Sequence, residues 1–84
     1  MDHKHRKVLA AIFEKPERAK IDWRDIEALF VTLGAEISEG NGSRIRVAMN
    51  GVRAVFHRPH PQKEANRGTV RSVRRFLETA GVRP

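Results

Sequence analysis

The sequence contains no cysteine and no long apolar run, and each absence excludes whole classes of protein. Without cysteine there is no disulfide framework, no thiolate metal site and no cysteine nucleophile. No apolar run is long enough for a membrane-spanning helix, and the amino terminus lacks the apolar core of a signal peptide. Internal repeats and low-complexity segments are also lacking. We therefore expect a soluble, cytoplasmic protein.

Acidic residues are scarce in only one half of the chain. Residues 1–40 contain seven Lys or Arg and eight Asp or Glu, whereas residues 41–84 contain ten and two, so the halves carry −1 and +8 of the net charge of +7. Such a one-sided positive charge indicates a polyanionic partner, most simply nucleic acid. A solubilising cationic surface is the alternative. A length of 84 residues suits a single domain with a small core.

The basic half begins with a predicted β-hairpin in residues 41–61. Asn50-Gly51 readily adopts the positive φ angles of a two-residue type I′ turn, and this turn would pair Val47 with Ala54. Side chains then alternate between two faces. The apolar face carries Ile45, Val47, Met49, Val52, Ala54 and Phe56, and the opposite face carries Arg44, Arg46, Arg53 and His57. In this register Arg44 and His57 are direct cross-strand neighbours, close enough to act on one phosphate.

Apolar spacing predicts three helices and one further strand. The helices are expected over residues 3–15, 22–33 and 69–80, and the strand over residues 35–39. Asp22 is the predicted N-cap of the second helix, and Gly34 is expected just after its end. Trp23 opens the apolar stripe of that helix, so we interpret it as a core or hinge residue rather than a base-stacking platform. Residues 17–21 and the segment after Pro61 are interpreted as connectors.

These elements predict an α+β fold with a three-stranded antiparallel sheet. The helices would gather on the apolar face of the sheet and leave the arginine face uncovered.

Four segments, in order, carry a resemblance to a known family. They are WRDIEALFVTLGAE at 23–36, Gly42-Ser43 before a strand, NGVRAVFHRPHP at 50–61 and KEANRGTVRSVRRFLETAGV at 63–82. Over residues 22–82, about three-quarters of the chain, the sequence resembles the HicA toxins of toxin-antitoxin pairs. The resemblance implies a fold like that of double-stranded-RNA-binding domains, with α-β-β-β-α order. It also implies a metal-independent endoribonuclease that cleaves mRNA, inhibits growth and is neutralised by a HicB-like antitoxin. Residues 1–20, a helix and a connector, are extra to this core in one domain of residues 1–84.

The chain departs from the family at one catalytic position. Many members carry a catalytic histidine just after Gly-Ser, where this sequence has Arg44 and Ile45. Metal-free RNA cleavage needs a base for the 2′-hydroxyl proton, an acid for the leaving 5′-oxygen and cations on the transition state. We predict that His57 replaces the missing histidine from the neighbouring strand, with His60 as the second proton carrier and Arg44 on the phosphate. The predicted RNA-binding residues are Arg44, Arg46, Arg53, Arg58 and Lys63.

Other readings of these residues stay open. His57 could bind RNA or antitoxin without catalysing, and His60 could shape its loop, which would make the chain a catalytically silent RNA-binding module. A DNA-binding adaptor fits the charge but lacks a recognisable recognition helix. A zinc site from His57 and His60 is disfavoured because FHRPHP contains no Cys and no acidic residue, so we expect no metal and no cofactor.

Overall fold

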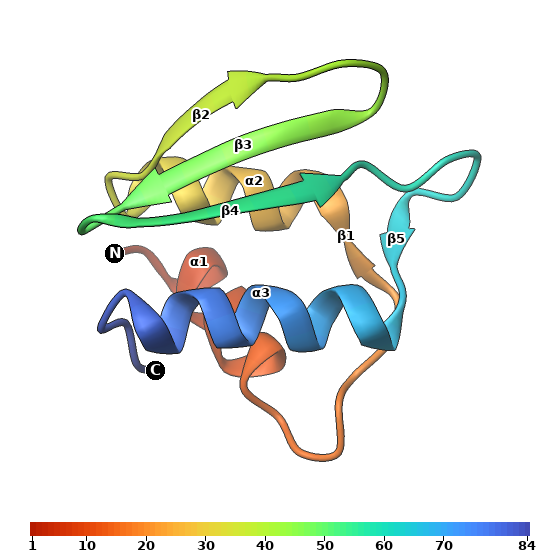
Figure 1. Cartoon of the computed structure of the whole chain (residues 1–84). Helices are drawn as coiled ribbons and strands as arrows, with labels where there is room; N and C mark the ends of the chain where they lie inside the picture. Colours follow the sequence, from red (N-terminus) through yellow and green to blue (C-terminus); the bar gives the residue numbers. More distant parts are fainter.

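Three helices and five strands build the chain, and the computed structural model describes all 84 residues (Figure 1). Their bounds are α1 His3–Ile12, β1 Ile21–Asp22, α2 Trp23–Thr32, β2 Glu36–Glu39, β3 Arg44–Met49, β4 Val52–His57, β5 Glu64–Ala65 and α3 Arg67–Thr79. Helices α2 and α3 lie on one side of the β2-β3-β4 sheet, and α1 packs against both of these helices. The α+β prediction, with a three-stranded antiparallel sheet, is confirmed.

The hairpin turn has the predicted conformation. Asn50 and Gly51 have φ angles of 52° and 78°, as a type I′ turn requires. Val47 consequently pairs with Ala54 and Arg44 with His57, which confirms the predicted register. The side-chain amide of Asn50 also donates a 2.8 Å hydrogen bond to the carbonyl of Ala80, directly after α3. The turn therefore sets the strand pairing and ties the hairpin to the last helix.

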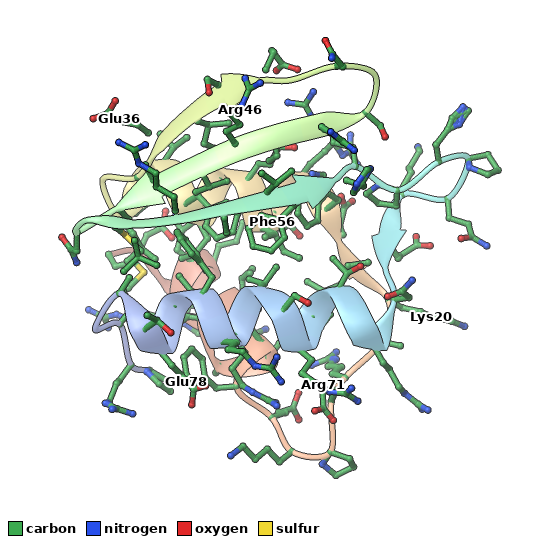
Figure 2. All side chains as sticks on the ribbon, viewed as in Figure 1. Lys20, Glu36, Arg46, Phe56, Arg71 and Glu78 are labelled. Atoms are coloured by element: carbon green, nitrogen blue, oxygen red, sulfur yellow. The ribbon has the colours of Figure 1, made fainter.

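The third strand, β2, completes the sheet in the order β2-β3-β4. Ile37 lies opposite Val47 and packs against the core, as predicted for an inward-facing residue. Figure 2 shows the two sides of the sheet: Phe56 projects toward α3, whereas Arg46 projects away from the helices. One side of the sheet is thus covered and the other is open to solvent.

Helix ends follow from capping groups in the sequence. The Asp22 carboxylate accepts a 2.9 Å hydrogen bond from the N–H of Arg24, so the predicted N-cap of α2 is confirmed. At the other end of α2, Gly34 has a φ of 87°. The N–H groups of Gly34 and Ala35 donate to carbonyls of the last turn, at Val31 and Phe30. This pairing closes the helix as a Schellman motif.

Two predicted helix boundaries were wrong by a few residues. Helix α1 ends at Ile12 instead of residue 15, because a residue before proline is disfavoured in the α conformation and the last turn unwinds before Pro16. Helix α3 begins at Arg67 instead of residue 69 and ends at Thr79. Its start is set by Asn66, whose side chain accepts a 2.8 Å hydrogen bond from the N–H of Thr69.

The two predicted connectors contain a second, very small sheet. Strands β1 and β5 pair antiparallel, with Ile21 opposite Ala65. The ladder continues into α2, because the N–H of Trp23 donates a 2.9 Å hydrogen bond to the carbonyl of Lys63. A strand of two residues has no room for an alternating pattern, so sequence periodicity could not reveal it.

The core is a single cluster of 18 buried residues drawn from helices and sheet alike. Val8, Leu9 and Ile12 of α1 belong to it, so the N-terminal helix shares the core of the remaining chain. Phe30, Phe56 and Phe76 meet at its centre with ring centroids 5.8–5.9 Å apart. Each such aromatic pair adds about 0.5–1.5 kcal/mol beyond its buried area. None of the three helices has the length and apolar character needed to cross a membrane.

An ion-pair cluster fastens the connector after α1 to α3. One carboxylate oxygen of Glu17 accepts hydrogen bonds of 2.9 Å from both Arg71 and Arg74. Arg74 is buried, and it also donates to the carbonyl of Glu14. The hydrogen bond from Arg71, reinforced by that from Arg74, lowers the pKa of Glu17 to about 2.

This cluster predicts acid-sensitive stability. Because folding lowers the Glu17 pKa from 4.5 to about 2, its stabilisation is complete above pH 4.5 and is lost as the pH falls toward 2. Glu17→Gln should therefore lower the unfolding free energy at pH 7 and should differ progressively less from wild type between pH 4.5 and 2. Urea unfolding followed by circular dichroism at several pH values measures this difference. Glu78→Gln, on a side chain that makes no ion pair, is the control, and an equal pH dependence for both variants would contradict the prediction.

Candidate functional site

Most of the predicted site residues lie on the solvent side of the sheet, which we call the outer face. Strand alternation and register place eight side chains there: Glu36 and Ser38 from β2, Arg44, Arg46 and Ala48 from β3, and Arg53, Val55 and His57 from β4. All are exposed except the half-buried Ala48. Three arginines and a histidine therefore share an open surface with a single carboxylate.

The outer face is ordered in rows across the strands. Arg44 lies opposite His57 in the row farthest from the turn, and Arg46 lies opposite Val55 in the next row. Directly opposed side chains have Cβ atoms about 4.5–5.5 Å apart, so Arg44 and His57 are close enough for one small anion to contact both. Neither Arg44 nor His57 makes an ion pair within the chain. Both are available to a ligand.

A hollow of about 550 Å³ runs over the centre of the outer face. Arg46 and Arg53 border it, and Val55, 56% exposed, provides apolar surface within it. Cations beside apolar surface suit a nucleotide chain, because phosphates meet the arginines while sugars and bases meet the apolar part. The outer face therefore has the composition of a nucleic-acid-binding surface.

His57 also borders a second hollow, of about 290 Å³, between β4 and the first turns of α3. Asn66, Thr69 and Ser72 line its other side and bring an amide and two hydroxyls near the histidine. The Ser72 hydroxyl donates a 3.1 Å hydrogen bond to the carbonyl of Gly68. These polar groups give His57 a partly enclosed setting at the edge of the open face.

Arg58, also predicted to bind RNA, lies on the opposite side of the sheet from Arg44 and His57. Its Nε and Nη2 atoms donate to the two oxygens of Glu27 at 2.8 and 3.1 Å, and Nη1 and Nη2 donate to those of Glu39 at 2.8 and 2.9 Å. We call this group the Arg58 clamp: Glu27 of α2, Arg58 after β4 and Glu39 of β2. The hydrogen bonds that Arg58 donates to Glu27, and next those to Glu39, raise the pKa of Arg58. The hydrogen bond from Arg58 in turn lowers the pKa of Glu39.

The clamp secures the end of the sheet where Arg44 and His57 lie. The backbone N–H of Arg58 donates a 2.8 Å hydrogen bond to the carbonyl of Ser43, next to Arg44. Arg46 reaches the same corner, since its Nη1 donates a 3.1 Å hydrogen bond to the carbonyl of Glu39. The guanidinium of Arg58 thus holds this end of the sheet from its covered side, while Arg44 and His57 lie on the outer face.

Trp23 is a core residue, as predicted, and it is 4% exposed. Its indole N–H donates a hydrogen bond to Glu27, and its ring packs at 5.9 Å from that of Phe56. Glu27 therefore bridges the tryptophan and the arginine, which explains how a half-buried carboxylate is stabilised in this position.

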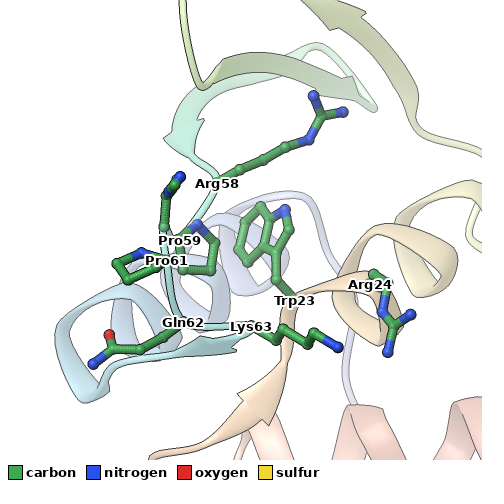
Figure 3. Close-up of a pocket in the computed structure, with 8 residues that line it drawn as sticks. Trp23, Arg24, Arg58, Pro59, Pro61, Gln62 and Lys63 are labelled. Atoms are coloured by element: carbon green, nitrogen blue, oxygen red, sulfur yellow. The ribbon is translucent and has the colours of Figure 1, made fainter.

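The remaining predicted residues gather in a hollow of about 350 Å³ beside Trp23 (Figure 3). This Trp23 hollow is lined by Trp23, Arg24, Arg58, Pro59, His60, Pro61, Gln62 and Lys63. The predicted site therefore falls into two parts: Arg44, Arg46, Arg53 and His57 on the outer face, and Arg58, His60 and Lys63 around Trp23. His57 and His60 line different hollows, and no group of three or more His, Cys, Asp or Glu side chains is placed to hold a metal ion.

Sequence reasoning missed Glu27 and Glu39, although one signal was present. Continuing the alternation of β4 by two residues from Phe56 places Arg58 on the covered side, and Glu39, opposite the buried Ile45, lies on that side too. Strand alternation could not reveal the contact between Arg58 and Glu27, because this contact depends on the angle at which α2 crosses the sheet. Thr69 and Ser72 were missed for the same reason.

The match to a family of known proteins agrees with these features. A family model described as HicA toxin of bacterial toxin-antitoxin systems matches residues 23–82, more than two thirds of the chain. This chain belongs to the HicA toxin family. As a HicA protein it is the toxin of a toxin-antitoxin system, and an antitoxin partner is implied. Searches among curated proteins and among solved structures found no match.

The HicA match begins at Trp23, so α1 and β1 precede it. Both are nevertheless built into this toxin, since α1 contributes to the core and β1 pairs with β5 inside the matched region. Apart from the two-residue β5, the matched region has the order α2-β2-β3-β4-α3, which is the α-β-β-β-α order that the resemblance implied.

Proposed function

We propose that this HicA toxin is an endoribonuclease that cleaves mRNA in the cytoplasm without a metal ion and is neutralised by a HicB-like antitoxin. The observation that carries the proposal is the pairing of Arg44 with His57 on an exposed, arginine-rich sheet face. A histidine beside an unpaired arginine supplies a proton carrier and a cation to the same phosphate. The membership of the chain in the HicA family supports the same reaction class.

The roles follow from the position of each group. His57 carries a proton between RNA and solvent, because imidazole is the side chain whose ordinary titration range lies nearest physiological pH. Arginine stays charged at physiological pH and is a poor acid or base, so Arg44, in the position after Gly42-Ser43, instead stabilises charge on the phosphate. Arg46 and Arg53 hold the neighbouring phosphates. His60 as the second proton carrier and Lys63 as an RNA contact lie around Trp23, beyond the end of β4.

A catalytically silent RNA-binding module is the second candidate. It is favoured by one observation: the position that carries histidine in many family members is Arg44, and the two histidines nearest to it line different hollows. The outer face would then bind RNA and block it without cleavage. The two candidates differ in a single measurable property, the appearance of RNA fragments.

The first prediction separates them. Purified wild-type protein should cleave mRNA in EDTA, and His57→Ala should lower the rate about 100- to 10,000-fold, the usual contribution of a general acid or base. Fragments are resolved by gel electrophoresis, and growth is followed after induction of each variant. His3→Ala, which removes an exposed histidine of α1, is the matched control. Equal rates for His57→Ala and wild type would exclude His57 as a catalytic residue, and absence of any cleavage would favour the silent module.

The second prediction concerns the RNA-binding surface. Replacing Arg44 and Arg46 by Ala should weaken RNA binding and reduce the log–log slope of affinity against salt by about 1.4, at about 0.7 per phosphate contact. Fluorescence anisotropy between 50 and 300 mM salt, roughly the range in which this dependence is steep, gives the slope. Arg75→Ala is the control, because Arg75 is exposed on α3, whereas Arg71 and Arg74 are held by Glu17. If Arg75→Ala reduces the salt slope of RNA affinity more than the replacement of Arg44 and Arg46 does, the RNA binds on α3 instead.

The third prediction is that the antitoxin covers the outer face. An arginine desolvated without an anion is costly, so the antitoxin should bring at least one carboxylate to this face and bury Arg44 and His57. RNA and antitoxin should then compete, and Arg44→Ala with Arg46→Ala should weaken both. Titration of antitoxin into a toxin–labelled RNA complex measures the competition. Saturating antitoxin that abolishes toxicity while the RNA affinity stays unchanged would show inhibition from another surface.

A further inference from the structure

The two carboxylates of the Arg58 clamp are held very differently. Glu27 is 22% exposed and also accepts the indole N–H of Trp23, so it is anchored on two sides. Glu39 is 67% exposed, and its carboxylate is bonded only by Arg58. Glu39 is therefore the more accessible carboxylate of the clamp and has a single partner, so a competing anion in solution replaces it more readily than Glu27.

The contact between Arg58 and Glu39 has the geometry of phosphate recognition. Nη1 and Nη2 each donate to a different oxygen of Glu39, at 2.8 and 2.9 Å. A guanidinium binds two phosphate oxygens through the same two-pronged arrangement. An incoming phosphate would also keep the charge balance, because one anion replaces another while Glu27 remains. The Glu39 carboxylate thus occupies a position that suits a phosphodiester.

The surroundings of Arg58 extend this position into a larger site. Arg58 lines the Trp23 hollow together with Lys63, which makes no ion pair, and with Pro59 and Pro61 (Figure 3). The two prolines offer apolar surface to a sugar or base next to a phosphate. Arg58 also follows His57 directly in the chain. An RNA strand bound on the outer face would therefore reach Arg58 by bending around the end of the sheet.

We propose that Arg58 is a second phosphate-binding site for RNA, which Glu39 fills in the free protein and which a phosphodiester enters by displacing Glu39. The proposal rests on the proposed function, since the nucleotide that would bind in the Trp23 hollow is the neighbour of the nucleotide at the cleavage site. Glu39 is then an internal competitor of RNA. The polyanion meets an arginine that is already oriented by Glu27, and no new cavity has to open.

The test compares two carboxylates of the same strand. Glu39→Gln removes the competitor and should tighten the binding of a fluorescent 2′-O-methyl RNA, which lacks the attacking hydroxyl, by about fivefold beyond the effect of Glu36→Gln. Glu36→Gln is the matched control, because it removes the same charge from β2 but Glu36 makes no ion pair. The gain should disappear when Arg58→Lys is added, since lysine keeps the charge and loses the two-pronged geometry. Arg58→Lys also avoids leaving Glu27 without a cation.

Each outcome is decisive. Equal gains for Glu39→Gln and Glu36→Gln, or a Glu39→Gln gain that survives in the Arg58→Lys background, would overturn the second phosphate site while RNA binding to the outer face stands. An effect of Glu39→Gln on antitoxin affinity alone would make the hollow a protein contact and also overturn it. Failure of the wild-type protein to bind RNA at all would overturn the proposed function and the second site together.

Discussion

The Asn50-Gly51 turn is the constraint on which the fold and the candidate site both depend. Its positive φ angles fix a two-residue loop, and the loop fixes which residues of β3 and β4 face each other. A shift of one residue would exchange the two faces of the strand, burying arginines and exposing the apolar side chains. The same asparagine bonds the carbonyl of Ala80, so the register is held against the last helix as well. The pairing of Arg44 with His57, at the far end of the ladder, is a consequence of this turn.

The distribution of charge shows how the two halves of the chain cooperate. The basic second half contains ten Lys or Arg, and three of them, Arg58, Arg71 and Arg74, form ion pairs. All three are held by glutamates of the first half: Glu17, Glu27 and Glu39. The glutamates of the first half therefore do more than lower the net charge, because they hold these three arginines in ion pairs that join distant segments of the chain. The arginines of the outer face have no such partner and stay free for an anion.

Local rules account for the parts of the structure that the sequence predicted. The turn, the strand faces, the Asp22 cap and the core position of Trp23 all follow from residues close together in the chain. The parts that were missed depend on contacts between distant segments. The pairing of β1 with β5 is too short for any periodicity, and the bond from Arg58 to Glu27 depends on how a helix crosses a sheet. Arg58 was grouped with the outer-face arginines although the alternation of β4, continued past Phe56, places it on the covered side, where the structure has it.

That separation changes how the loss of the family's histidine is understood. With Arg44 after Gly-Ser, β3 brings a cation but no imidazole to the outer face, so the proposed cleavage requires a proton carrier from the neighbouring strand. His57 is the residue that the register places there, and the backbone N–H of the next residue, Arg58, holds the strand end by donating to the carbonyl of Ser43. A histidine at the end of an edge strand would otherwise be free to fray with the strand. Glu27, which stays bonded to Arg58 when RNA displaces Glu39, therefore serves the candidate site by holding the strand end in place.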